Sequence, residues 1–199
     1  MKQDAIYLGA AEPVLRQFQD FVLKWQKSVN LISPTTTSDI WNRHILDCAQ
    51  LFEYIPSIAK KLVDMGTGGG FPGVVLAIMN KALTGPLTDI YFVESDIKKS
   101  IFLKECIREF GLNASVLNER LENVKLDAVD VVTARALKEL KVLIQLGQGF
   151  INPQTTCLFL KGERVDDEIS NNPYPCHLEK IKSKTAENGV ILKIGELHI

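Results

Sequence analysis

The sequence lacks an excess of charge of either sign, because 23 lysines and arginines stand against 24 aspartates and glutamates in 199 residues. This balance excludes a protein that grips nucleic acid over a wide basic surface. Any polyanionic partner must therefore be met by a local cluster of positive charge. Long apolar runs are also missing, since the longest one, residues 74–79, is far too short to span a bilayer.

The start of the chain, Met1-Lys2-Gln3-Asp4, lacks the apolar segment that a secretory signal carries. We therefore expect a soluble, cytoplasmic protein with no membrane partner.

Cysteine and histidine are sparse and do not form a metal-binding pattern. No pair of the four cysteines has C-x-x-C spacing, and the three histidines are scattered. Cys48, Cys106 and Cys157 lie in apolar patterns typical of buried, reduced thiols. We expect no metal site. The sequence also offers no Ser-His-Asp or Cys-His arrangement for nucleophilic catalysis.

The length suits one α/β domain with a modest helical extension. Apolar residues recur at steps of three and four over residues 13–31, which predicts an amphipathic helix. A second helix is expected to start at a cap, Ser38 or Asp39, and to end near Pro56. We predict an N-terminal helical cap over residues 1–60 and a separate α/β body over residues 61–199.

Beyond residue 60, short apolar strands alternate with helices, which indicates a mostly parallel sheet. The expected strands are residues 61–65, 90–94, 114–117, 130–133 and 155–160. The expected helices are residues 74–81, 97–110 and 136–147. Residues 176–182 and 190–194 alternate in polarity and are expected to add a terminal antiparallel pair. The predicted fold class is therefore α/β and Rossmann-like.

A glycine-rich turn lies between the first expected strand and its helix, which is the context of a nucleotide-binding loop. It reads Asp64-Met65-Gly66-Thr67-Gly68-Gly69-Gly70-Phe71-Pro72-Gly73. Glycines there permit positive φ and close approach of a ligand. The match to G-x-G-x-x-G at Gly68, Gly70 and Gly73 is weak by itself.

Two acids indicate which nucleotide cofactor the loop takes. Asp64, just before the loop, suits an amino-acid ammonium and a sulfonium but is unfavourable beside a pyrophosphate. Glu94, at the end of the second strand, can accept hydrogen bonds from two ribose hydroxyls. A ribose acid also occurs in NAD sites. These residues favour S-adenosylmethionine (SAM) over NAD, and an NAD-dependent oxidoreductase remains the alternative from a different class.

Five segments together carry a specific resemblance that covers the chain from about residue 14 to Gly162. They are Asn30-Leu31-Ile32, Arg43-His44-Ile45-Leu46-Asp47, residues 64–73 with their Gly-Phe-Pro-Gly ending, Arg120-x-Glu122 and Ala134-Arg135-Ala136. The chain resembles the bacterial 16S ribosomal RNA guanine-N7 methyltransferases, also called glucose-inhibited division protein B. The resemblance implies a Rossmann-like methyltransferase that uses SAM to methylate N7 of a guanine in the 530 loop.

The resemblance also implies which residues contact the cofactor. By position these are Gly66, Phe71, Leu121, Glu122 and Arg135. The glycine loop and its two acids add Asp64, Gly68 and Glu94. Two positions depart from the family pattern, since Leu121 stands where alanine is common and Cys48 where serine is usual. A backbone contact at residue 121 would tolerate the exchange.

Guanine N7 carries a lone pair and no proton, so its methylation needs alignment rather than a catalytic acid or base. We expect RNA contacts from positive groups near the strand ends, which are Arg43, Lys98, Arg120, Arg135 and Lys161. We expect a monomer that acts on 16S ribosomal RNA or a small-subunit particle. A methyltransferase of another RNA or a small molecule, and a ribosome-binding module without catalysis, remain alternatives.

Overall fold

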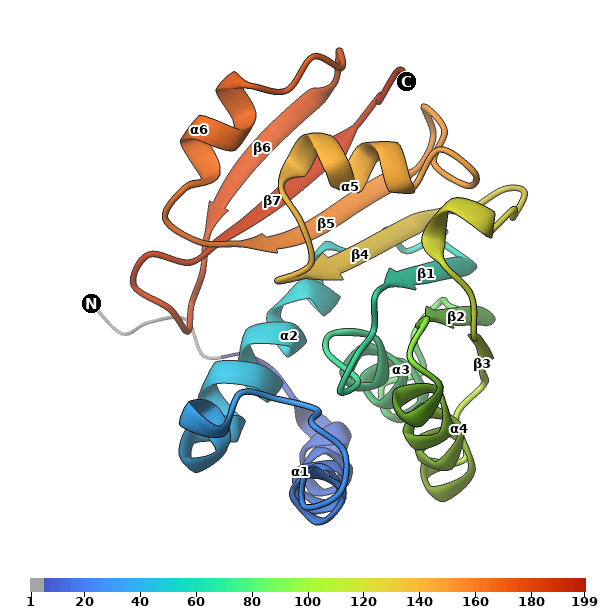
Figure 1. The fold of residues 1–199 in the computed structure, drawn as a ribbon, viewed down its shortest axis with the longest axis vertical. Coiled ribbons are helices and arrows are strands. Elements are labelled where there is room, and N and C mark those ends of the chain that lie inside the picture. Colours follow the sequence, from blue (N-terminus) through green and yellow to red (C-terminus); the bar gives the residue numbers. More distant parts are fainter. Residues whose placement is uncertain (1–5) are drawn as a thin grey trace.

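The computed structural model describes residues 6–199 and shows a seven-stranded sheet flanked by helices (Figure 1). The strands are β1 (Lys61–Met65), β2 (Asp89–Val93), β3 (Ala114–Leu117), β4 (Val131–Arg135), β5 (Thr156–Lys161), β6 (His177–Lys182) and β7 (Val190–Gly195). Their order is β3-β2-β1-β4-β5-β7-β6. β1 to β5 are parallel, and β7 pairs antiparallel with both β5 and β6. The predicted fold class is confirmed.

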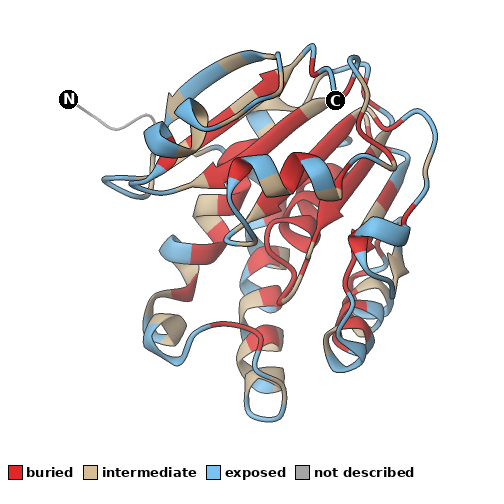
Figure 2. Ribbon diagram, turned by 45° about the horizontal axis from the view of Figure 1, so that its top comes forward, coloured by how far each residue is buried: buried red, intermediate tan, exposed pale blue. Residues whose placement is uncertain are grey.

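Alternating side chains divide the core between the two faces of the sheet. In β1, Leu62 joins one hydrophobic cluster while Val63 and Met65 join the other. One face is covered by α1 (Glu12–Gln26), α3 (Gly73–Ala82) and α4 (Ile97–Phe110). The other face is covered by α5 (Leu140–Leu146) and α6 (Val165–Ser170). Figure 2 shows the buried strands between these layers.

The N-terminal helix packs on the α/β body through aromatic side chains. Phe18 of α1 is fully buried, and the ring of Phe21 stacks on Phe102 of α4 with 5.8 Å between centroids. Full burial of such a side chain contributes about 1.5–3 kcal/mol. The same core cluster contains residues of α1 and Leu62 of β1. Since the core is continuous across residue 60, the division into a cap and a body stays a prediction.

The second N-terminal helix differs from the expected one. Residues 34–54 form η2 (Pro34–Asp39), a π-helical turn η3 (Trp41–Leu46), α2 (Asp47–Ala49) and η4 (Gln50–Tyr54). Neither expected cap is made, because Ile40 precedes η3 and Asp39 accepts a hydrogen bond from the Asn42 side chain instead. Local π-helical turns often occur at functional sites.

Two further differences lie after β4 and β5. The expected helix over residues 136–147 starts only at Leu140, because Ala136 has a φ of +49° and Glu139 is extended. These conformations are incompatible with a helix. The short helix α6 was not predicted, since six residues are too few to show a clear helical period. Within residues 6–199, no helix has the length and apolar character needed to cross a membrane.

Candidate functional site

The carboxyl ends of the parallel strands form the edge where the candidate site lies. The strand order reverses between β1 and β4, whose neighbours run outward in opposite directions from this point. Open α/β sheets bind ligands in the crevice at such a reversal. The glycine loop, Glu94, Arg135 and Lys161 all follow or end strands at this edge.

Asp64, just before the glycine loop, binds the backbone at the other end of the loop through its side chain. Its Oδ2 accepts a hydrogen bond from the Gly73 amide at 2.9 Å, and its Oδ1 accepts one from the Thr133 hydroxyl at 2.7 Å. The side chain is fully buried, and this burial raises the pKa of Asp64 to about 7. Asp64 therefore ties the start of α3 and strand β4 to β1.

The backbone of the loop leaves room for a ligand at Gly68. Gly66 and Gly68 have φ values of +64° and +57°, a region that favours glycine. A Cβ on Gly66 would collide with the Leu137 side chain at 2.8 Å. A Cβ on Gly68 would meet only the Gly66 carbonyl oxygen at 3.6 Å, so this position faces open space.

Glu94 is held by backbone amides and still has acceptor capacity. Its Oε2 accepts from the Gly68 amide at 2.9 Å, and its Oε1 accepts from the Asp96 amide at 2.7 Å. A carboxylate offers about four acceptor positions. Glu94 can therefore accept hydrogen bonds from a ligand without releasing the loop.

These groups surround a cavity of about 550 Å³, which we call the glycine-loop cavity. It is lined by six of the expected cofactor contacts, which are Gly66, Gly68, Glu94, Leu121, Glu122 and Arg135. The other two, Asp64 and Phe71, lie outside its lining. The Phe71 ring packs 5.5 Å from that of Phe18 and 5.1 Å from that of His44, so it joins the loop to the N-terminal helices. The role of each residue toward a cofactor stays a prediction.

A second cavity of about 480 Å³, the flanking cavity, lies at the ends of β4 and β5. It shares residues 135–138 and Val142 with the glycine-loop cavity. The rest of its polar wall consists of Glu139, Lys161, Gly162, Arg164 and Glu168. Sequence reasoning did not identify Lys138, Glu139, Arg164 or Glu168, because charged residues in such polar stretches look like ordinary solvated residues.

Lys161 is engaged inside the protein. Its Nζ lies 2.6 Å from Glu168 Oε2 and donates to the Lys138 carbonyl at 2.8 Å. Its side chain is only 6% exposed. The structure therefore places this expected RNA contact in the wall of the flanking cavity, already paired with a carboxylate.

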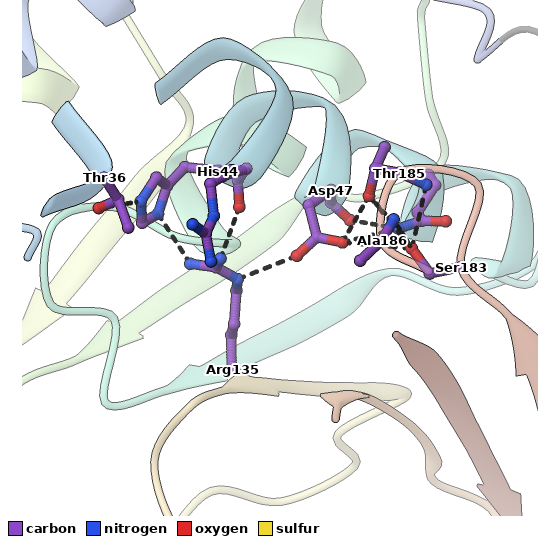
Figure 3. Close-up of polar contacts among 9 residues, drawn as sticks. Thr36, His44, Asp47, Arg135, Ser183, Thr185 and Ala186 are labelled. Atoms are coloured by element: carbon purple, nitrogen blue, oxygen red, sulfur yellow. Dashed lines mark hydrogen bonds and ion pairs between the residues drawn. The ribbon is translucent and has the colours of Figure 1, made fainter. Parts of the chain in front are cut away.

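The guanidinium of Arg135 is fixed by three partners from the second N-terminal helix (Figure 3). Nε donates to Asp47 Oδ2 at 3.1 Å, Nη1 lies 2.9 Å from His44 Nδ1, and Nη2 donates to the Arg43 carbonyl at 2.6 Å. Arg135 has five N–H donors, so two remain for a ligand. Residues 43–47 and residues 134–136, two of the segments that carried the resemblance, are thus in direct contact.

The partners of Arg135 are held in turn by other segments (Figure 3). Asp47 Oδ1 accepts from the Thr185 hydroxyl at 2.8 Å in the turn between β6 and β7. His44 Nε2 lies 2.8 Å from the Thr36 hydroxyl. We call the set of Thr36, His44, Asp47, Arg135, Ser183 and Thr185 the Arg135 network.

His44 must be neutral in this network. Arginine has no acceptor, so Nδ1 accepts from Arg135 and Nε2 carries the proton. Burial, together with the charges of Arg135 and Arg43, lowers the pKa of His44 to about 4. His44 therefore stays uncharged at neutral pH.

The expected RNA-binding cations are only partly brought together. Arg120 lines the glycine-loop cavity, Arg135 lines both cavities and Lys161 lines the flanking one. The exposed side chains of Arg43 and Lys98 line neither cavity. No group of histidine, cysteine or acidic side chains within residues 6–199 is arranged to hold a metal ion.

Comparisons with known proteins decide the family. The family model of GidB, described as rRNA small subunit methyltransferase G, matches residues 11–192. The chain belongs to this family. A ribosomal RNA small subunit methyltransferase G from Dinoroseobacter shibae is 39% identical over 92% of this chain and 95% of that protein. One from Cereibacter sphaeroides is 40% identical over 92% of this chain and 89% of that protein.

Solved structures share the fold at low sequence identity. A ribosomal protein L11 methylase from Lactobacillus delbrueckii superposes with a TM-score of 0.59 at 15% identity, covering 76% of this chain and 77% of that one. The family assignment confirms the resemblance seen in the sequence and contradicts the oxidoreductase alternative. This member of the methyltransferase G family has both cavities at the edge where its fold class binds ligands.

Proposed function

We propose that this enzyme transfers a methyl group from SAM to N7 of a guanine in the 530 loop of 16S ribosomal RNA. The observation that carries the proposal is the family match over residues 11–192, which includes every residue of the two cavities. The supporting geometry is a cavity of about 550 Å³ at the point where the strand order reverses. Its size lies within the roughly 300–1,000 Å³ of small-molecule sites.

The residues of the glycine-loop cavity fit SAM. Glu94 retains acceptor positions for ribose hydroxyls, and the open side of Gly68 admits a ligand close to the backbone. Leu121 supplies an apolar contact, and Glu122 and Arg135 add charged groups. When bound, SAM supplies an electrophilic methyl group. Asp64 and Phe71 support the loop from outside the cavity lining.

The chain's own part in the reaction is to orient the acceptor and to exclude water. Guanine N7 has no proton to lose, so no side chain needs to act as a general base. Correct alignment alone contributes several kcal/mol to such a transfer, up to about 7–11 kcal/mol in well-oriented reactions. The Arg135 network, which fixes a side chain shared by both cavities, is suited to this task.

RNA contacts, location and assembly belong to the same proposal. Arg43, Lys98, Arg120 and Arg135 contact the RNA, Lys161 supports the wall of the flanking cavity that the RNA enters, and the cap over residues 1–60 helps to dock the RNA. The enzyme acts as a monomer in the cytoplasm. With a near-neutral total charge and few phosphate contacts, its affinity for RNA should depend only weakly on salt.

The test is methyl transfer from radiolabelled SAM to small-subunit particles, followed by mapping of N7-methylguanine. The wild-type enzyme is expected to label one guanine in the 530 loop. Glu94→Ala should abolish transfer and SAM binding, whereas Glu105→Ala, at an exposed ion pair on α4, should leave both unchanged. Labelling of another RNA or position, or binding of NAD in place of SAM, would overturn the proposal.

A further inference from the structure

We infer that the flanking cavity binds the guanine nucleotide to be methylated and that Glu139 reads the Watson–Crick edge of this base. The inference rests on the proposed function and adds the place and the specificity residue of the acceptor. The flanking cavity shares five residues with the glycine-loop cavity, so the two spaces adjoin. An acceptor atom must come within about 3–3.5 Å of the transferred carbon. The acceptor must therefore occupy space that adjoins the cofactor, as the flanking cavity does.

The lining of the flanking cavity matches the parts of a nucleotide. Val142, Leu143 and Leu160 form an apolar side against which the face of a base can pack. Lys138 and Arg164 are exposed at the same cavity and suit the flanking phosphates. Enzymes that modify a base bring it out of its stack into a pocket of this mixed character.

An internal ion pair fixes the shape of the cavity. Lys161 and Glu168 pair at 2.6 Å, and their side chains are 6% and 16% exposed. Lys161 also holds the Lys138 carbonyl, and Glu168 Oε2 accepts from the Leu140 amide at 2.8 Å. The pair thus joins the end of β5 and α6 to the segment between β4 and α5. Lys161 acts here as a positioning residue.

Glu139 is the carboxylate left available in this cavity. It is exposed and lines the flanking cavity but not the glycine-loop cavity. Across the described residues, 6–199, its carboxylate makes no hydrogen bond or ion pair, whereas Glu168 is engaged twice. Glu139 therefore offers a free carboxylate to a ligand of the flanking cavity.

The chemistry of guanine fits a single carboxylate at that place. The Watson–Crick edge of guanine presents two neighbouring donors, N1–H and N2–H, on the side of the base opposite N7. One carboxylate can accept both in charge-assisted hydrogen bonds. Adenine presents an acceptor at N1, which the carboxylate would repel. A base whose N7 faces the glycine-loop cavity turns its two donors into the flanking cavity, which Glu139 lines.

The first experiment fills the cavity by Gly162→Phe. A Cβ at Gly162 would meet nothing within 4 Å, and the same is true of Gly195, which lines neither cavity. Gly195→Phe is therefore a matched control. We expect Gly162→Phe to lower kcat/KM for small-subunit particles at least tenfold while leaving the Kd for S-adenosylhomocysteine unchanged. Transfer at the wild-type rate by Gly162→Phe would overturn the inference.

The second experiment tests the reading of the base. Particles reconstituted with inosine at the target lack the N2 amino group, so the wild-type enzyme should methylate them about tenfold less efficiently. Glu139→Ala should lose this preference for guanosine. Glu163→Ala, an exposed acid outside the flanking cavity lining, should keep it. If Glu139→Ala still preferred guanosine over inosine as strongly as the wild type does, Glu139 would not be the residue that reads the base.

The two experiments separate this inference from the proposed function. If the wild-type enzyme forms no N7-methylguanine, the proposed function fails. If it forms N7-methylguanine and both Gly162→Phe and Glu139→Ala behave as wild type, only the acceptor site is wrong.

Discussion

The two cavities at the sheet edge are built in different ways. One wall of the glycine-loop cavity is backbone from the turn after β1, at Gly66 and Gly68, and its other walls come from the segments that follow β2, β3 and β4. The flanking cavity is formed by the segment that leads from β4 into α5, by the end of β5 and by α6, joined by the pair of Lys161 and Glu168. Consecutive residues thus specify one wall of the first cavity, whereas the second is formed only when distant segments fold together.

The Arg135 network is likewise formed only when distant segments fold together. Arg135 and Asp47 lie 88 residues apart in the chain, and Thr185 reaches Asp47 from the turn between β6 and β7. Arg135 lines both cavities. A change in the hairpin turn can therefore affect the orientation of a side chain at the site without any contact with a ligand.

The largest effect is expected at the backbone wall of the glycine-loop cavity. Gly68→Val places a side chain in the open space beside the loop and should weaken S-adenosylhomocysteine binding at least a hundredfold, about 2.7 kcal/mol. Gly111→Val is the control, because Gly111 has nearly the same φ, +56°, at the end of α4. Both variants should lose similar stability, and calorimetric titration should show the binding loss in Gly68→Val alone. Equal affinities in the two would contradict a ligand beside Gly68.

A smaller effect, on folding, is expected in the Arg135 network. Asp47→Ala leaves the largely buried Arg135 guanidinium without its anion, since the two side chains are 20% and 13% exposed. The free energy of unfolding should fall by about 2 kcal/mol in urea denaturation. Asp166→Ala removes an exposed ion pair with Lys180 and should cost less than about 1 kcal/mol. If both variants lost a similar free energy of unfolding, Asp47 would stabilise the fold no more than an exposed ion pair does.

The Lys161 pair should give a similar loss of stability and, in addition, a distinct change in activity. Lys161→Met keeps much of the side-chain volume but leaves the largely buried Glu168 carboxylate without its cation and bonded only to the Leu140 amide, so we expect a loss of about 2 kcal/mol. Because the turn after β4 loses its link to β5, KM for small-subunit particles should rise while S-adenosylhomocysteine binding is unchanged. If the kinetics are those of the wild type, the ion pair does not shape the acceptor site.

At neutral pH the smallest effect is expected at His44, which instead changes the pH dependence of stability. The pKa of His44 is lowered in the folded state, so its contribution to stability is complete above pH 6.5 and is lost as pH falls toward 4. The raised pKa of Asp64 acts in the opposite direction between about pH 4 and 7, because folding favours its protonated form. Comparison with His44→Gln isolates the histidine. Over this range the wild type should lose more stability than the variant, and parallel curves would contradict a neutral His44.

The same contrast explains how much the sequence could predict. The glycine loop, Glu94 and the strands were predictable because their signals lie in consecutive residues. The late start of α5 was not, since alanine favours helices and its residue type gives no signal of the positive φ at Ala136. The role of Asp47 and the place of the Glu139 carboxylate in a cavity were not predictable either, because each depends on which distant segments become neighbours.

One crossed measurement tests whether the glycine-loop cavity holds the cofactor and the flanking cavity holds the acceptor. S-adenosylhomocysteine affinity and methyl transfer to small-subunit particles would be measured for Gly68→Val and Gly162→Phe. We predict that Gly68→Val loses both, whereas Gly162→Phe keeps the affinity and loses the transfer. Loss of cofactor affinity in Gly162→Phe, or normal transfer by it, would contradict this assignment of the two cavities.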